Sequence, residues 1–248
     1  MQYHLLNGDA LLQRFPDSVP GVRIVLREAL IDGPADGDVP EGFIRQRAAF
    51  IQEAYPSEPG RYERLTVPDL RRILALPPEA AVYLWFEDDL FCQVHLWFLA
   101  WLLDTRVPVA AAYRTGAGLD LRTGFGGLDA EQLHAVWEAS QPLDAALLRG
   151  LGGLWAAFRD GDRAALARQA ALLEARMPGL QRAAQAHLDC FPADGSPGRP
   201  ERVLAELLRQ PGPAQLGQLT AAFGQREPVY GFGDLQIRRL LQGMGLYG

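Results

Sequence analysis

The chain has 248 residues, of which 48% are hydrophobic and 22% are charged, a composition typical of a globular protein with one large domain or two smaller ones. Its formal net charge of −6 gives no general attraction to nucleic acid or to an anionic membrane. All 24 basic residues are arginine, which excludes the lysine-dependent sites of pyridoxal-phosphate enzymes, of kinases and of phosphate-loop nucleotide hydrolases.

The apolar segments and the cysteines favour a cytoplasmic protein without a membrane anchor. Residues 1–12 include polar side chains where a secretory leader has an apolar core. The longest apolar run, Leu90–Leu103, is too short to span a bilayer and contains two polar side chains. Cys92 and Cys190 are far apart in sequence, so we expect no disulfide and a reducing compartment.

The first 140 residues alternate between strand and helix patterns. Short apolar runs predict strands at 3–6, 22–26, 82–86 and 108–113. Amphipathic or apolar segments predict helices at 10–15, 43–55, 62–76, 90–103 and 129–140. A glycine-rich stretch at 116–127 is typical of a loop or hairpin. This order predicts an α/β domain over residues 1–140, with a mostly parallel, Rossmann-like sheet.

The patterns after Pro142 are helical. Residues 141–190 predict a helical connector, with helices over 143–173 and 177–188 and a break at Asp160-Gly161-Asp162. Residues 191–248 predict a small module in which a linker precedes short helices at 201–209, 215–223 and 234–241. This module has the outline of a helix-turn-helix or winged helix, which could contact DNA through Arg238 and Arg239, or it could be a helical cap that packs on the core.

The most informative stretch is residues 82–104, VYLWFEDDLFCQVHLWFLAWLLD. A short apolar strand leads directly into Glu87, Asp88 and Asp89, and a helix that is apolar on nearly every side follows. A helix that is apolar all round is buried in a protein interior. Open α/β folds bind their ligands where buried strands end, so the sequence predicts a ligand pocket at this junction.

Carboxylates follow three of the predicted strands: Asp9, Glu28, and Glu87 with Asp89. Parallel strands end at the same edge of a sheet, so we expect an acidic pocket and take these four as candidate catalytic residues. Such a pocket could bind Mg²⁺ or Mn²⁺, which could orient a phosphate ester and activate water. Local roles are the alternative: Asp9 could cap the helix after it, and Asp88 or Asp89 could cap the central helix.

Four residues near these carboxylates are candidates for binding a ligand: Asn7, Gly8, Arg27 and Gln93. Gly8 permits a tight turn and a close approach of the backbone to a ligand. Arg27 could line the same rim or form a partly buried ion pair with Glu28. Gln93 is a polar side chain on an apolar helix, so it must find a partner among the neighbouring carboxylates or in a ligand.

Cys92 and His95 lie three residues apart and share a face of the central helix. Two ligands do not make a structural zinc site, and a cysteine–histidine nucleophile pair is not expected within one turn of a buried helix. We therefore predict a small buried thiol and a hydrogen-bonded histidine of the core.

The segments HLLNGDAL, REAL followed by IDGP, LWFEDDLFCQVHLWFLAWL and GFGGLDAEQL, spread over residues 1–140, resemble the bacterial family called domain of unknown function 1835. Its most specific part is WFE-x-DL-x-x-Q. The resemblance implies the α/β fold and a helical, winged-helix-like C-terminal region, and it brings no established activity. It implies these signature positions: Asn7, Gly8, Asp9, Arg27, Glu28, Gly33, Trp85, Glu87, Asp89, Leu90 and Gln93. Asp88 and His95 are variable positions of the pattern.

The sequence leaves two functional hypotheses open, beside a third possibility that the arginine–carboxylate groups are structural pairs and that function depends on a partner. It does not fix whether the protein is an enzyme or what its oligomeric state is. In the first, the carboxylate-rich pocket binds a small, phosphate-containing ligand for metal-assisted hydrolysis or group transfer. This requires Asp9, Glu28 and Glu87 or Asp89 to lie close together beside a cavity. In the second, the chain is a regulatory or interaction protein whose C-terminal module contacts a protein partner or DNA, of which the acidic chain does not favour DNA. This requires Arg226, Arg238 and Arg239 on one exposed face.

Overall fold

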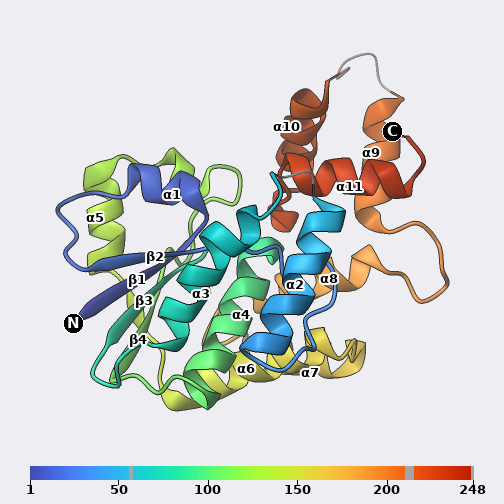
Figure 1. The fold of residues 1–248 in the computed structure, drawn as a ribbon. Coiled ribbons are helices and arrows are strands. Elements are labelled where there is room, and N and C mark those ends of the chain that lie inside the picture. Colours follow the sequence, from blue (N-terminus) through green and yellow to red (C-terminus); the bar gives the residue numbers. More distant parts are fainter. Residues whose placement is uncertain (56–57, 210–214, 247–248) are drawn as a thin grey trace.

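The structure is a computed structural model that describes residues 1–55, 58–209 and 215–246 (Figure 1). A five-stranded sheet has the order β2-β1-β3-β4-β5, in which β1 to β4 are parallel and β5 is antiparallel. The strands are β1 (Gln2–Asn7), β2 (Val22–Leu26), β3 (Ala81–Trp85), β4 (Ala111–Thr115) and β5 (Gln141–Pro142). The predicted α/β class with a mostly parallel sheet is confirmed.

The strands form because their apolar side chains are buried on both faces of the sheet, as parallel strands require. Leu6 and Trp85 pack on one face with α1 (Asp9–Arg14) and α5 (Ala130–Glu138), whereas Leu5 and Leu84 pack on the other. That second face is covered by α2 (Glu41–Ala54), α3 (Val67–Leu74) and α4 (Leu90–Thr105). Figure 1 shows these two helical layers on opposite sides of the strands.

Helix α4 is the centre of the molecule, as its composition predicts. Most of its side chains are buried, including the polar Gln93 and His95. It packs on the sheet and also against α6 (Ala145–Arg159) and α8 (Leu180–Cys190), while α7 (Arg163–Leu173) packs on α6 and α8. Gly152 allows α6 to approach closely, since a Cβ there would lie 3.3 Å from the Cα of Trp101.

Several element boundaries differ from the sequence prediction. The helix expected at 62–76 begins with a π-helical turn, Tyr62–Thr66, before α3. The fourth strand starts at Ala111 rather than at residue 108, and β5 was not predicted. Because β5 pairs with β4 and α6 packs on α4, the elements after residue 140 continue the α/β layers. The division into parts at residues 140 and 190 stays a prediction.

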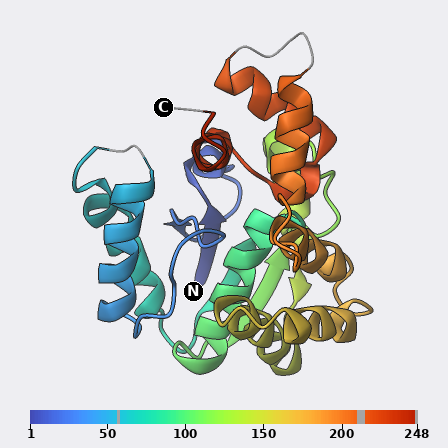
Figure 2. The same cartoon turned by 90° about the vertical axis from the view of Figure 1, so that its right-hand side faces the viewer.

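The three short helices predicted near the C-terminus are confirmed as α9 (Arg199–Leu208), α10 (Leu216–Arg226) and α11 (Asp234–Gly243). A short 3₁₀ turn, Pro228–Tyr230, precedes α11 and contacts α4 and α8. Helix α11 is tied to the N-terminal part by Arg239, whose Nε lies 2.5 Å from Asp32 Oδ2. Figure 2 shows α11 (dark red) end-on above the N-terminal strands. None of the helices in the described ranges is long and apolar enough to cross a membrane.

Candidate functional site

The candidate site lies at the carboxyl ends of β1, β2 and β3. The chain leaves β1 for β2 through α1 on one face of the sheet, and it leaves β3 for β4 through α4 on the other face. Connections that depart to opposite faces open a crevice between the two strands, and doubly wound sheets bind ligands there. Asn7 ends β1, and Glu87 to Asp89 follow β3, so both sides of this crevice carry polar side chains.

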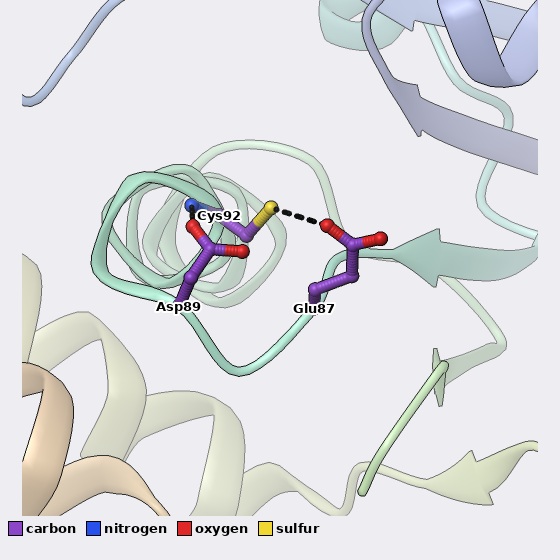
Figure 3. A group of neighbouring side chains, drawn as sticks. All are labelled: Glu87, Asp89 and Cys92. Carbon is purple, nitrogen blue, oxygen red and sulfur yellow. Dashed lines mark hydrogen bonds between the residues drawn. The ribbon is translucent and has the colours of Figure 1, made fainter. Parts of the chain in front are cut away.

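Glu87, Asp89 and Cys92 form a cluster at the β3–α4 junction, and one potential ligand atom from each lies within 4.8 Å of the others (Figure 3). Asp89 is the N-cap of α4, where its Oδ1 accepts a hydrogen bond of 2.9 Å from the Cys92 backbone N–H. The Cys92 thiol donates to Glu87 Oε2 at 3.5 Å. Glu87 Oε1 accepts from the backbone N–H of Phe125 at 2.5 Å. The cap predicted for Asp89 is therefore present, and the cap places its second oxygen beside Glu87 and Cys92.

The cluster brings two carboxylates, Glu87 and Asp89, close together. Neither Glu87 nor Asp89 forms an ion pair with any residue that the structure describes. Burial, and then the neighbouring Glu87, raise the pKa of Asp89 to about 6. Burial and Asp89 also raise the pKa of the Cys92 thiol well above its ordinary value, so the sulfur is protonated near neutral pH.

A chain of hydrogen bonds through His95 and Asn7 holds the Cys92 sulfur in place. The Leu30 N–H donates to His95 Nε2 at 3.2 Å, so His95 Nδ1 carries the ring proton and donates to Asn7 Oδ1 at 3.1 Å. Asn7 Nδ2 then donates to Cys92 Sγ at 2.9 Å. Burial lowers the pKa of His95 to about 3, which keeps the ring neutral. His95 is the hydrogen-bonded core histidine that the sequence predicts, and it also orients the Asn7 amide.

The cluster opens into a recess of about 360 Å³ that we call the cluster recess. It is lined by Asn7, Glu87, Asp89, Phe91, Cys92, residues 121–124, Gly231, Gly233 and Gln236. A Cβ at Gly124 would collide with the Glu87 carboxylate, and one at Gly231 would collide with Asp89. Both glycines also have positive φ, 50° and 64°. The C-terminal module thus reaches the carboxylates directly.

A second recess of about 570 Å³ adjoins the first and shares Asn7, Phe91 and Gln236 with it. We call it the rim recess, and its lining includes Asp9 and Arg27. Arg27 forms ion pairs with Asp9 at 2.7 Å and with Asp69 at 2.5 Å. The predicted helix cap by Asp9 is wrong. Gly8 is the N-cap of α1 without a side-chain bond, and the Asp9 carboxylate turns to Arg27 instead because an ion pair is the stronger partner.

Glu28 lines the rim recess but is committed to a structural network. Its side chain is fully buried, as is that of Arg47, and the two form an ion pair of 2.9 Å. The Tyr62 hydroxyl and the Ala29 N–H also donate to this carboxylate. The structure therefore shows no ion pair between Arg27 and Glu28 in the residues it describes. Arg27 pairs with Asp9 and Asp69 instead, and Glu28 pairs with Arg47.

The remaining candidates have distinct surroundings. Gly8 lines the rim recess with φ of 86°, and nothing lies within 4 Å of a Cβ built there, so its backbone is open to a ligand. Gln93 is 1% exposed, and its Nε2 donates to the Glu87 carbonyl at 2.6 Å. Gln93 therefore holds the backbone of the cluster rather than lining a recess. Asp88 points away from the cluster and pairs with Arg114.

Seven of the eight predicted residues line the two joined recesses, all but Gln93. Of the four predicted carboxylates, only Glu87 and Asp89 lie close to one another. Cys92, which the sequence predicts only as a buried thiol of the core, is the third member of the cluster. One signal could have found it: Cys92 follows the N-cap by three residues, and the first helical turn places that position beside the capping side chain. Gly124, Gly231 and Gln236 come from distant segments and had no local signal.

The donor set of the cluster fits a divalent metal ion of intermediate softness. Zn²⁺ accepts carboxylate and thiolate ligands, and its catalytic sites keep three protein ligands and one open position. Mg²⁺ and Mn²⁺ prefer sites made of oxygen atoms alone, so the Cys92 sulfur shifts the expected ion toward Zn²⁺. Asn7 would supply the outer hydrogen bond that fixes the sulfur ligand.

Compared with known proteins, the chain matches no protein-family model, no curated protein and no solved structure. The geometry of the two recesses is therefore the basis for interpreting the site.

Proposed function

We propose that the protein binds a small polar molecule in the two joined recesses and that Glu87, Asp89 and Cys92 form the reactive centre. One observation supports this most strongly: potential ligand atoms of two carboxylates and a thiol lie within 4.8 Å of one another beside an opening, and neither carboxylate forms an ion pair within the described residues. Such a group costs folding stability, and costs of this kind concentrate at functional sites. Its position where the sheet connections reverse agrees with a ligand crevice.

The chemistry that this centre supports best is metal-assisted hydrolysis or group transfer, with Zn²⁺ as the ion that the donor set fits. A bound divalent ion would supply an activated water and a Lewis acid. The chain's own residues keep the ligand set in place. The Phe125 N–H holds the Glu87 carboxylate, Gln93 holds its backbone, and Asn7 holds the Cys92 sulfur.

Thermal unfolding with added ZnCl₂, MnCl₂ or MgCl₂, against a chelator blank, tests this function. A ligand at a hundred times its Kd stabilises the native state by about 2.7 kcal/mol. We expect Zn²⁺ to raise the Tm by roughly 5–10 °C, since each kcal/mol shifts a domain of this size by about 2–4 °C. Glu87→Gln and Cys92→Ser should lose this shift.

The matched control is Asp162→Asn, which alters another aspartate N-cap, on α7 and exposed to solvent. It should keep the full Zn²⁺ response. An equal response in Glu87→Gln and in the wild type would place the ion elsewhere, and no response to any of the three ions would contradict the metal-assisted function.

The alternative, a C-terminal module that acts on DNA, finds less support. Arg226 pairs with Glu206, and Arg239 pairs with Asp32 and lies over the Phe50 ring, so these two arginines are engaged within the chain. Helix α11 contributes Gln236 to both recesses, which favours a role in closing the ligand site. The Rossmann-like designation, the cytoplasmic location and membership of domain of unknown function 1835 stay predictions from the sequence.

A further inference from the structure

A third recess, of about 570 Å³, lies on the other side of the acidic triplet. Its walls include Asp88, Arg114, Gly118, Arg122 and Arg182, and we call it the arginine recess. Consecutive residues of the β3–α4 loop diverge, so Glu87 and Asp89 line the cluster recess while Asp88 lines this one. Leu121 and Arg122 line both. The two recesses therefore meet at one loop.

Arg114 is a buried cation with an incomplete set of partners. Its side chain is 2% exposed and pairs with Asp88, but its Nε has no hydrogen-bond partner among the described residues. Burial lowers the pKa of Arg114 to about 10. An additional anion in the recess would offset this cost of burying the charge.

Arg122 and Arg182 bring two further guanidinium groups, both exposed, and neither forms an ion pair within the described ranges. A Cβ at Gly179 would lie 3.3 Å from Arg182 Nη2 and 3.8 Å from Asp88 Cγ, which places the Arg182 head near the Asp88–Arg114 pair. The recess also has two acids, Asp88 and Asp120. Asp88 also accepts from the Gly118 N–H at 2.9 Å, and Asp120 accepts from the Arg122 backbone N–H at 2.7 Å.

We propose that the arginine recess binds the phosphate group of a phosphorylated small molecule whose reacting part lies at Glu87, Asp89 and Cys92. Three arginines against two aspartates leave the recess with one net positive charge, and Arg122 and Arg182 form no ion pair within the described residues. A phosphate monoester, with a charge of −1.5 to −2 near neutral pH, is attracted to such a site. The planar fork of arginine also matches two phosphate oxygens at once. In a chain with a net charge of −6, this local excess of positive charge selects for an anion. The link to the cluster rests on the proposed function, whereas phosphate binding at the recess does not.

Inorganic phosphate is the probe, measured by isothermal titration calorimetry in a buffer without other oxyanions. We expect saturable binding that weakens at least tenfold in the double variant Arg122→Gln/Arg182→Gln. Both side chains are exposed and without ion pairs in the described structure, so the variant should fold, and circular dichroism checks this. Arg168→Gln, an exposed arginine of α7 outside the recess, is the matched control and should bind phosphate as the wild type does.

Three outcomes would overturn the proposal: no saturable phosphate binding, equal weakening by Arg168→Gln, or acetate bound as tightly as phosphate. Glu87→Gln separates the two proposals. If it keeps phosphate binding while the wild type shows no Zn²⁺ response, the metal-assisted function fails and the arginine recess stands. If it abolishes phosphate binding and the double arginine variant does not, phosphate binds at the cluster and the recess proposal is wrong.

Discussion

The rim recess and the cluster recess lie side by side and share Asn7, yet their carboxylates differ in whether they pair with an arginine. In the rim recess, Asp9 pairs with Arg27 and Glu28 pairs with Arg47. In the cluster recess, the hydrogen bonds to the carboxylates from the part of the chain that the structure describes come from backbone N–H groups and a thiol. The end of a strand places a carboxylate at the edge of the crevice. A carboxylate that pairs with an arginine stabilises the fold, whereas one without such a partner is available to bind or react with a ligand.

The energetic consequences of the two arrangements have opposite signs. A buried ion pair is costly to break, because removing one partner leaves the other charge buried without compensation. Two carboxylates that lie close together repel one another and destabilise the fold when both are ionised. Substitutions in the rim recess should therefore lower the free energy of unfolding, whereas neutralising one carboxylate of the cluster should raise it.

The largest expected effect is that of Arg47→Met. Arg47 is fully buried and donates to Glu28 and to the carbonyls of Ala29, Asp32 and Pro34. Its loss would leave the Glu28 carboxylate without its cation and three carbonyl groups without this donor. We expect a loss of about 3–5 kcal/mol in the free energy of unfolding, measured by chemical denaturation. Arg45→Met, an exposed arginine on the same helix, should change it by less than about 0.5 kcal/mol. A loss below about 1 kcal/mol for Arg47→Met would contradict the conclusion that the Glu28–Arg47 network stabilises the fold.

The next effect has the opposite sign. Asp89→Asn keeps an oxygen that can accept from the Cys92 N–H, and it removes the charge that lies beside Glu87. With a chelator present at pH 8, we expect the variant to be more stable than the wild type by about 1–3 kcal/mol, since each pKa unit corresponds to about 1.4 kcal/mol. Asp144→Asn is the matched control, an exposed N-cap that pairs with Arg176, and it should be slightly less stable than the wild type.

The gain from Asp89→Asn should depend on pH in a defined direction. The pKa of Asp89 is raised in the folded state from 3.8 to about 6, so the native protein holds this proton more tightly than the unfolded chain does. The wild type therefore loses stability as the pH rises from about 4 to about 6, and the advantage of the variant grows over that interval. Denaturation curves of both proteins at pH 4, 6 and 8 measure it. An advantage that is constant across these pH values would contradict the charge repulsion.

The elements around the site could be predicted from local patterns, because burial and capping leave a signature within a few residues. The strand at 82–86, the apolar helix after it and the Asp89 cap are all of this kind. The strand β5 left no such signature, since its two residues are defined only by pairing with Tyr113 and Arg114 of β4.

The division between the two recesses could not be predicted, because it depends on partners that are distant in sequence. Glu28 accepts a hydrogen bond from Arg47, 19 residues away in sequence. Asp89 lies against the backbone of Gly231, which comes from the far end of the chain. The four candidate carboxylates all follow strands, and the sequence gives no sign of which will find an arginine. Cys92 illustrates the same limit, because an apolar helix predicts a buried thiol but not that its first turn borders an opening.

The smallest expected effect is that of Asp9→Asn, and it tests the comparison most directly. The Asp9 side chain is 40% exposed, and Arg27 keeps Asp69 as its partner, so the loss of stability should stay below about 1 kcal/mol. Because Asp9 lies in the compensated group, the Zn²⁺-induced rise in Tm should equal that of the wild type, unlike that of Glu87→Gln. If Asp9→Asn abolished the Zn²⁺ response, the compensated carboxylates would belong to the reactive centre after all. The two recesses would then act as one acidic site, as the sequence alone predicts.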